Sequence, residues 1–276
     1  MQSSPVRSNA LTVDVEDYFH VAAFDATVSP EQWHSLPQRV VGNTDTLLEQ
    51  FDAHNAKATF FILGWVAEKF PDLVRRIHAC GHEVASHGYA HAKASTQTPE
   101  QFTADIQRAK ALLEDITGEA VVGYRAPSFS IDKSNEWAFG ALKEAGYQYS
   151  SSTYPVVHDL YGTPDWPQQP YMRHEGIWEC PMPVLNKVGK QWPIAGGGYF
   201  RQYPYALSKW LFARASLNQT KPQIFYLHPW EIDPDQPKIR RAPFISRFKH
   251  YTNLKETERK LRSMIQELAD CRFSCC

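Results

Sequence analysis

The sequence predicts an α/β fold, a distorted (β/α) barrel of about seven parallel strands that forms a single domain over residues 1–276. Strand-like and helix-like runs alternate along most of the chain, which favours a parallel sheet with crossover helices. A length of 276 residues is common for one such domain. In these barrels the carboxyl ends of the strands face the active site, so reactive side chains are expected there.

The first part of the chain, up to residue 152, alternates regularly. Short apolar and β-branched runs predict strands at 10–15, 58–63, 82–87, 120–124 and 147–152. Capped runs with an apolar stripe predict helices at 43–56, 65–81 (with a restart at Pro71), 98–118 and 134–146. The helix at 98–118 is the clearest, because Thr98 can cap it, Pro99 suits its first turn and Gly118 can end it.

The alternation breaks between residues 153 and 204, which are rich in Pro, Gly, Trp and Tyr. A long irregular segment inside a compact domain is more often functional than idle, so we expect it to shape a substrate groove. Within it we expect a strand at 176–184 and a turn at 195–200. A helix at 205–217, a strand at 223–228, a loop and a final helix at 253–269 complete the chain.

Composition excludes some classes of partner. The formal net charge is −1, so no overall field attracts nucleic acid or an anionic membrane, and we expect no nucleic-acid partner. No segment reaches 18 consecutive apolar residues, which predicts no transmembrane helix. The N-terminal residues lack the apolar run of a signal peptide, so a cytoplasmic location is the expectation. The sequence leaves the oligomeric state open.

Four expected strands end in side chains that can do chemistry. These are Asp14, Glu16 and Asp17 at the end of the first strand, His87 and His91 at the end of the third and in the next turn, Arg125 at the end of the fourth, and His228 at the end of the last. Each has an ordinary explanation when taken alone: acids are common at strand ends, and His228 could be a core histidine. The H-x-x-x-H spacing could also arise by chance among 11 histidines. On a helical turn, however, two histidines four residues apart can reach one cation.

Together these residues suit metal-assisted hydrolysis of an amide or ester. Two imidazoles and one carboxylate, with open positions for water, are the ligands of a catalytic zinc-type site. A second carboxylate can take a proton from water, a separate histidine can give a proton to the leaving group, and an arginine can hold the base ionised.

The order of these motifs resembles the polysaccharide deacetylases of carbohydrate esterase family 4. The matching pieces are TVDVEDYF (12–19), HGYAH (87–91), RAP (125–127) and YLHPW (226–230). Members of that family have a distorted (β/α) barrel and remove acetyl groups from N-acetylated sugars. The stretches DVEDYFHVAAF, GGGYFRQYPY and FYLHPWEID further resemble a subgroup associated with bacterial exopolysaccharide and exosortase loci.

The resemblance implies a role for each residue. Asp14 would be the general base, held by Arg125, and His228 would protonate the leaving amine. His87, His91 and one acid of the first motif would hold a divalent metal, for which we expect zinc. In an extended strand side chains 14 and 16 share a face, which favours Glu16 over Asp17; a bend after Val15 would favour Asp17.

The chain departs from the family pattern at two places. Gly88 stands where the family has a hydroxyl residue, and the stretch YQYSSSTYP (147–155) lacks the aspartate that would orient His228. Asp159 or Asp233 could take over that task. Pro127, Tyr199 and Trp230 are the expected contacts with an N-acetylated glycan, the expected partner.

Two other functions stay open. A hydrolase of a small cyclic amide, similar to allantoinases, could share the fold, although that branch lacks the metal-ligand set. A non-catalytic carbohydrate-binding barrel is the other alternative, and the intact acids and histidines argue against it.

Overall fold

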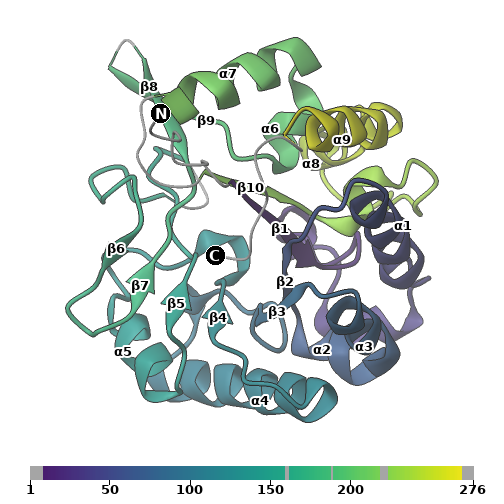
Figure 1. The fold of residues 1–276 in the computed structure, drawn as a ribbon. Helices are drawn as coiled ribbons and strands as arrows, with labels where there is room; N and C mark the ends of the chain where they lie inside the picture. The colour runs from purple at the N-terminus through teal and green to yellow at the C-terminus, as the bar shows by residue number, and fades with distance from the viewer. Residues whose placement is uncertain (1–8, 159–161, 188, 218–222, 269–276) are drawn as a thin grey trace.

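The computed structural model describes residues 9–158, 162–187, 189–217 and 223–268. Its centre is a curled eight-stranded sheet in the order β10-β1-β2-β3-β4-β5-β7-β6 (Figure 1). The strands are β1 Ala10–Val15, β2 Thr59–Ile62, β3 Glu83–Ser86, β4 Gly123–Tyr124, β5 Tyr149–Ser150, β6 Tyr171–Met172, β7 Trp178–Glu179 and β10 Ile224–Leu227. Strands β8 Val184–Lys187 and β9 Lys190–Pro193 form a separate hairpin.

All strands of the large sheet run parallel except β6, which is antiparallel to β7. Seven parallel strands confirm the predicted α/β barrel. Strands β10 and β6 end the order, and within the described residues they do not pair with each other, so the barrel is open on that side. Strand β1 is buried along its whole length, as expected of a parallel strand covered on both faces.

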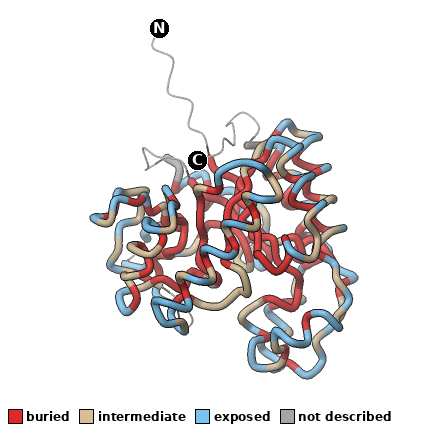
Figure 2. The backbone as a smooth tube through the Cα atoms, turned by 90° about the horizontal axis from the view of Figure 1, so that it is seen from below, coloured by how far each residue is buried: buried red, intermediate tan, exposed pale blue. Residues whose placement is uncertain are grey.

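Helices cover the outside of the sheet (Figure 1). They are α1 Val40–Ala53, α2 Gly64–Lys69, α3 Pro71–Ala79, α4 Pro99–Thr117, α5 Trp137–Glu144, α6 Gly197–Gln202, α7 Tyr205–Leu217, α8 Phe244–Tyr251 and α9 Leu254–Leu268. Short 3-10 helices lie at Ala22–Phe24, Pro30–Ser35, Ala94–Thr96, Pro127–Phe129 and Pro229–Ile232. Buried residues run through the interior of the fold, and exposed ones follow its rim (Figure 2).

Local signals placed most of these elements correctly. Helix α4 begins with the expected cap, in which Thr98 Oγ1 accepts from the Gln101 backbone N–H at 3.3 Å, and Gly118 ends it at φ 73°. The restart expected at Pro71 is present, because α2 ends at Lys69 and α3 begins at Pro71.

The irregular segment is where the structure differs from expectation. The turn expected at 195–200 contains the start of helix α6. The strand expected at 176–184 is the two-residue strand β7, followed separately by the hairpin β8–β9. The loop expected after β10 contains a 3-10 helix and α8. In the described part of the chain, no helix has both the length and the apolar character needed to cross a bilayer.

Candidate active site

The topology of the sheet gathers the predicted residues at one edge. Asp14 lies near the end of β1, and Glu16 directly follows that strand. His87, Arg125 and His228 each directly follow a strand, namely β3, β4 and β10. Because these parallel strands lie side by side, their carboxyl ends meet around one cavity of 150 Å³. Its lining includes Asp14, Glu16, His87, His91 and His228.

Glu16, His87 and His91 form a cluster that fits a divalent cation. Glu16 Oε1 lies 2.9 Å from Nε2 of His87 and 2.9 Å from Nε2 of His91. His87 Nδ1 lies 2.8 Å from the carbonyl oxygen of Arg125, which can only accept, so Nδ1 carries the proton. With the other nitrogen free of a proton, as metal binding requires, the Nε2 lone pair would point at a carboxylate oxygen, another acceptor. A cation between them satisfies both groups, which is how histidine ligands are commonly fixed.

The two histidines do not lie on a helical turn, as the spacing argument assumed. They belong to the loop after β3, in which Gly88 has φ 71° and His91 has φ 54°. Asp105 of α4 holds this loop: its Oδ2 accepts from the Tyr89 backbone N–H at 2.8 Å and its Oδ1 from that of Ala90 at 3.3 Å. The rings meet because the loop turns back through left-handed residues.

Asp17 is engaged elsewhere. Its Oδ1 accepts a hydrogen bond from the Tyr18 backbone N–H at 2.9 Å, and its Oδ2 accepts from those of Arg39 at 2.7 Å and Val40 at 3.0 Å. The last two groups belong to the amino end of α1, which a carboxylate stabilises by hydrogen bonding and by charge. Of the two acids that the sequence left open, the structure brings Glu16 to the imidazoles and keeps Asp17 on the helix.

Asp14 and Arg125 form a buried ion pair beside the cluster. Arg125 Nη1 donates to Asp14 Oδ1 at 2.6 Å and to Thr12 Oγ1 at 2.9 Å. The rest of the guanidinium is fixed by Ser151, whose carbonyl oxygen and Oγ accept from Nε and Nη2 at 3.1 and 3.0 Å. A ring of Phe61 lies 4.1 Å from the guanidinium carbon. Arg125 is therefore rigid, and it holds the Asp14 carboxylate in one orientation.

His228 is oriented by Glu231, which sequence reasoning missed. Glu231 Oε1 accepts from His228 Nδ1 at 2.7 Å, and Glu231 Oε2 accepts from Arg201 Nη1 at 2.6 Å. Asp233, one of the two candidates for this task, binds Arg39 instead. The other candidate, Asp159, lies outside the described residues. The available signal was an acid three residues after the histidine, in HPWE.

The charges around His228 set its protonation. Burial lowers its pKa, but Glu16, Glu231 and Asp14 more than offset this and raise the pKa to about 9. Burial also acts to raise the pKa of Glu16, yet His91 and His228 hold that pKa well below its ordinary value. His228 Nε2 lies 4.0 Å from both Asp14 Oδ2 and Glu16 Oε1, so its second nitrogen faces the cluster. The site thus pairs a protonated imidazole with ionised carboxylates.

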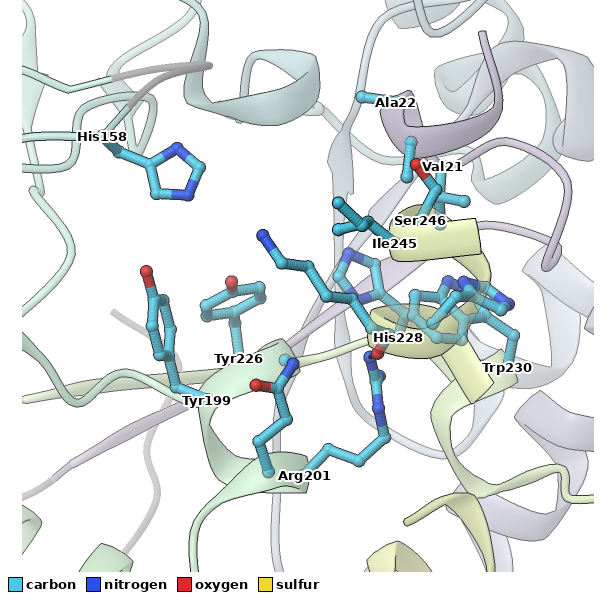
Figure 3. A pocket seen from close by; sticks show the side chains of 15 residues that line it. Val21, Ala22, His158, Tyr199, Arg201, Tyr226, His228, Trp230, Ile245 and Ser246 are labelled. Atoms are coloured by element: carbon cyan, nitrogen blue, oxygen red, sulfur yellow. Dashed lines mark hydrogen bonds between the residues drawn. The ribbon is translucent and has the colours of Figure 1, made fainter. Parts of the chain in front are cut away.

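A larger cavity of 540 Å³ adjoins the cluster and shares His228 and Tyr226 in its lining. Tyr199 lines it, and Figure 3 shows His158 and Tyr199 across the cavity from Ile245. The lining contains no aspartate or glutamate among the described residues, in contrast to the catalytic cluster.

The other two expected glycan contacts have different positions. Trp230 lines the larger cavity, but its ring is stacked between His228 at 5.2 Å and His250 at 4.3 Å, so neither face is open to a sugar. Pro127 is buried at the start of a 3-10 helix and lines neither cavity, whereas its neighbours Ala126 and Ser128 line the smaller one.

Two family models match the chain. Residues 23–150 match the model described as polysaccharide deacetylase, and residues 151–275 match a domain of unknown function, DUF3473. A peptidoglycan-N-acetylglucosamine deacetylase of Bacillus cereus is 34% identical over 96 residues, which are 34% of this chain and 35% of the relative. A peptidoglycan deacetylase of Helicobacter pylori is 33% identical over 107 residues, 38% of this chain and 35% of the relative. The matched segment spans about a third of these curated relatives.

Solved structures share the fold over almost the whole chain. A provisionally named polysaccharide deacetylase of Mycobacterium smegmatis superposes with a TM-score of 0.61 at 21% identity, over 97% of this chain and 86% of that one. A peptidoglycan N-acetylglucosamine deacetylase gives 0.51 at 19% identity, over 95% of this chain and 81% of that one. These likenesses concern the fold alone. The resemblance to polysaccharide deacetylases in sequence lies in residues 23–150, and the match to DUF3473 follows it over residues 151–275.

Proposed function

We propose that this protein is a metal-dependent hydrolase that removes N-acetyl groups from a sugar of a bacterial polysaccharide or its precursor. One observation carries the proposal: Glu16, His87 and His91 converge at 2.9 Å contacts, between the Asp14–Arg125 pair and the His228–Glu231 pair. Water and the N-acetyl group would give acetate and a free amine.

The ligand set of two imidazoles and a carboxylate suits zinc, which is the metal we propose. A divalent cation held there would polarise the acetyl carbonyl and make water acidic enough to ionise near neutral pH.

The residues of the chain would move the protons. Asp14, fixed by Arg125, takes the proton of the attacking water. His228 enters the reaction protonated and gives its Nε2 proton to the nitrogen of the departing amine. Glu231 keeps the Nδ1 proton of His228 in place, so that only Nε2 can transfer one.

For the natural substrate, we propose an exopolysaccharide or its precursor. Support comes from the resemblance of residues 14–24, 196–205 and 225–233 to the subgroup of exopolysaccharide loci. The curated relatives named above are deacetylases of N-acetylglucosamine in peptidoglycan or of peptidoglycan, which supports an N-acetylated glycan as the substrate class.

Acetate release from N-acetylglucosamine oligomers tests this function. We expect turnover that a chelator abolishes and added zinc restores. Asp14→Asn should lower kcat by about 10²-fold or more, because it removes the base, while the bound metal stays. Elemental analysis measures that metal. Full activity of Asp14→Asn, or ring opening of allantoin without acetate release, would contradict the proposal.

A pair of neighbouring variants tests the metal site. Glu16→Gln should lose most of the bound zinc, because it removes the charged ligand. Asp17→Asn should keep the zinc, because the Asp17 carboxylate binds backbone N–H groups at α1. Zinc per chain, measured by elemental analysis after dialysis, decides between them. The reverse pattern would show that Asp17 is the ligand.

A further inference from the structure

Helix α8 exposes three large apolar side chains. Phe244, Ile245 and Phe248 are 73%, 67% and 63% exposed, and the two phenylalanine rings stack with centroids 6.4 Å apart. Scattered exposed apolar residues are ordinary, but three adjoining ones on one short helix suggest a binding surface. We call these three residues, together with the basic side chains described next, the α8 surface.

The same stretch is strongly basic. No acidic residue occurs between Asp235 and Glu256. The basic residues up to the end of α8 are Lys238, Arg240, Arg241, Arg247 and Lys249. In the described part of the chain, none of these five forms an ion pair; Arg247 Nη1 donates only to the carbonyl oxygen of Arg240, at 3.0 Å. Their charge is therefore available to a partner.

The charged and apolar groups meet in a surface cavity of 360 Å³. Aromatic rings and cationic side chains both line it: Lys238, Arg240, Phe244, Arg247, Phe248 and Tyr251. Cations beside an apolar floor match a surface that offers phosphate groups above hydrocarbon.

Helix α8 also adjoins the candidate active site. Ile245, Ser246 and Lys249 line the 540 Å³ cavity, and Figure 3 shows Ile245 and Ser246 on its wall. Arg201, which binds Glu231, also donates from Nη2 to the carbonyl oxygen of Lys249 at 2.8 Å. The α8 surface therefore adjoins the wall of the substrate cavity.

We propose that the α8 surface docks this protein on an anionic lipid bilayer. Phe244, Ile245 and Phe248 enter the interface between headgroups and acyl chains, and the five basic residues bind lipid phosphates. A second copy of the chain is a poorer partner, because two identical surfaces would bring five cations against five without an acid.

Docking has a consequence for the substrate that rests on the proposed function. With α8 on the bilayer, the 540 Å³ cavity opens at the membrane surface. An acetylated sugar attached to a membrane lipid would then be presented to His228. The docking itself does not depend on catalysis.

Vesicle flotation of the full chain tests the docking. We expect the protein to float with vesicles of equal parts phosphatidylglycerol and phosphatidylcholine, but not with phosphatidylcholine alone, and binding should weaken as salt rises. Phe244→Ser with Phe248→Ser should lower partitioning about tenfold or more, because it removes two inserted rings. Lys238→Glu with Arg240→Glu should do the same through charge.

Matched controls exclude general effects of the changes. Trp192→Ser, at an exposed aromatic on β9, and Lys133→Glu, at an exposed lysine before α5, should bind vesicles as the wild type does. The phenylalanine variant should keep the wild-type melting temperature and acetate release from soluble oligomers, because Phe244 and Phe248 lie outside the substrate cavity.

Several results would overturn the proposal. They are equal binding to neutral and anionic vesicles, no binding to either, or α8 variants that bind as the wild type does. A wild-type dimer that the phenylalanine variant dissociates, without vesicle binding, would assign the surface to self-association. If vesicles bind but acetate is never released, docking stands and the proposed function fails.

Discussion

The contact between His228 and Glu231 couples the candidate general acid to a buried chain of charges. Glu231 lies between His228 at 2.7 Å and Arg201 at 2.6 Å. Burial alone would raise the pKa of Glu231, but Arg201 and His228 hold it below its ordinary value. Glu231 therefore stays ionised, and its charge is one of the causes that raise the pKa of His228 to about 9.

Glu231→Gln should shift the pH profile of deacetylation. A general acid must be protonated, so activity is lost as pH rises through the pKa of His228. Removing the Glu231 charge lowers that pKa, and the alkaline limb of kcat/KM should move to lower pH. A cation bound at Glu16 would offset the contribution of Glu16, but the contribution of Glu231 would persist. We also expect kcat/KM to fall about 10–100-fold at the optimum.

A pH series on the wild type and Glu231→Gln, with thermal melts as a stability control, measures this. An unchanged alkaline limb in a fully folded variant would mean that Glu231 does not position the acid. Asp233→Asn is the comparison, because Asp233 binds Arg39 and should leave that limb where it is.

At the scale of residues, the reactive side chains at strand ends were predictable from sequence. The hydrogen-bond partners that short turns bring to them were not. Period-two alternation favoured Glu16 over Asp17, and the structure places Glu16 beside the imidazoles and Asp17 at the amino end of α1. Glu231 was missed because a 3-10 turn brings it back to His228, whereas the family pattern led us to expect an aspartate. The expected glycan contacts could not be judged from sequence, because they require an aromatic ring with an open face. The ring of Trp230 is packed between His228 and His250, which only the structure shows.

At the scale of elements, the loop after β3, which carries His87 and His91, depends on Gly88 for its backbone conformation. Its φ of 71° disfavours other residues, and a Cβ there would lie 2.8 Å from Asp105 Oδ2. Asp105 is held by the backbone N–H groups of Tyr89 and Ala90, so it cannot move without loosening the loop.

Gly88→Ala should therefore cost about 1–2 kcal/mol of unfolding free energy and weaken zinc binding, since His87 and His91 flank the strained turn. Gly118→Ala is a matched control: its φ is 73°, but nothing lies within 4 Å of its added Cβ. It should cost a similar free energy and leave zinc binding unchanged. Denaturant melts and zinc titration measure both quantities. Equal zinc affinity in the two variants would show that the loop tolerates the added methyl group.

Elements with their own caps were predictable, and elements defined by distant contacts were not. Helix α4 carries its start and stop signals within the segment, and its observed bounds lie within one residue of those expected. Helix α6 begins at glycines that look like a turn. A Cβ on Gly196 would lie 2.0 Å from the Tyr226 carbonyl oxygen, so glycine there serves close approach to β10, a contact that no local pattern reveals.

At the scale of the whole molecule, the sheet crosses the boundary between the two family matches, because β5 at Tyr149–Ser150 pairs with β7 at Trp178–Glu179. Strand β1, near the start of the chain, pairs with β10 from Ala10 opposite Ile224 to Val13 opposite Leu227. The site crosses the same boundary, because His87 and Arg125 lie within residues 23–150 and His228 follows residue 150, whereas Asp14 and Glu16 precede both matches. Neither matched segment contains a complete site.

A fragment of residues 1–150 should therefore fail to fold cooperatively, although it contains all three proposed metal ligands. Without β10, β1 becomes an edge strand, and its backbone groups on that side lose their hydrogen-bond partners. The buried side chains of Leu11 and Val13 also lose their neighbours Phe225 and Leu227 in the core. Circular dichroism melts and zinc content of the purified fragment measure this, with the full chain as reference. Co-expression with residues 151–276 should restore a cooperative melt, because the missing strand returns in trans. A fragment 1–150 that melts cooperatively and holds zinc alone would instead show that β1 needs no partner from the DUF3473 segment.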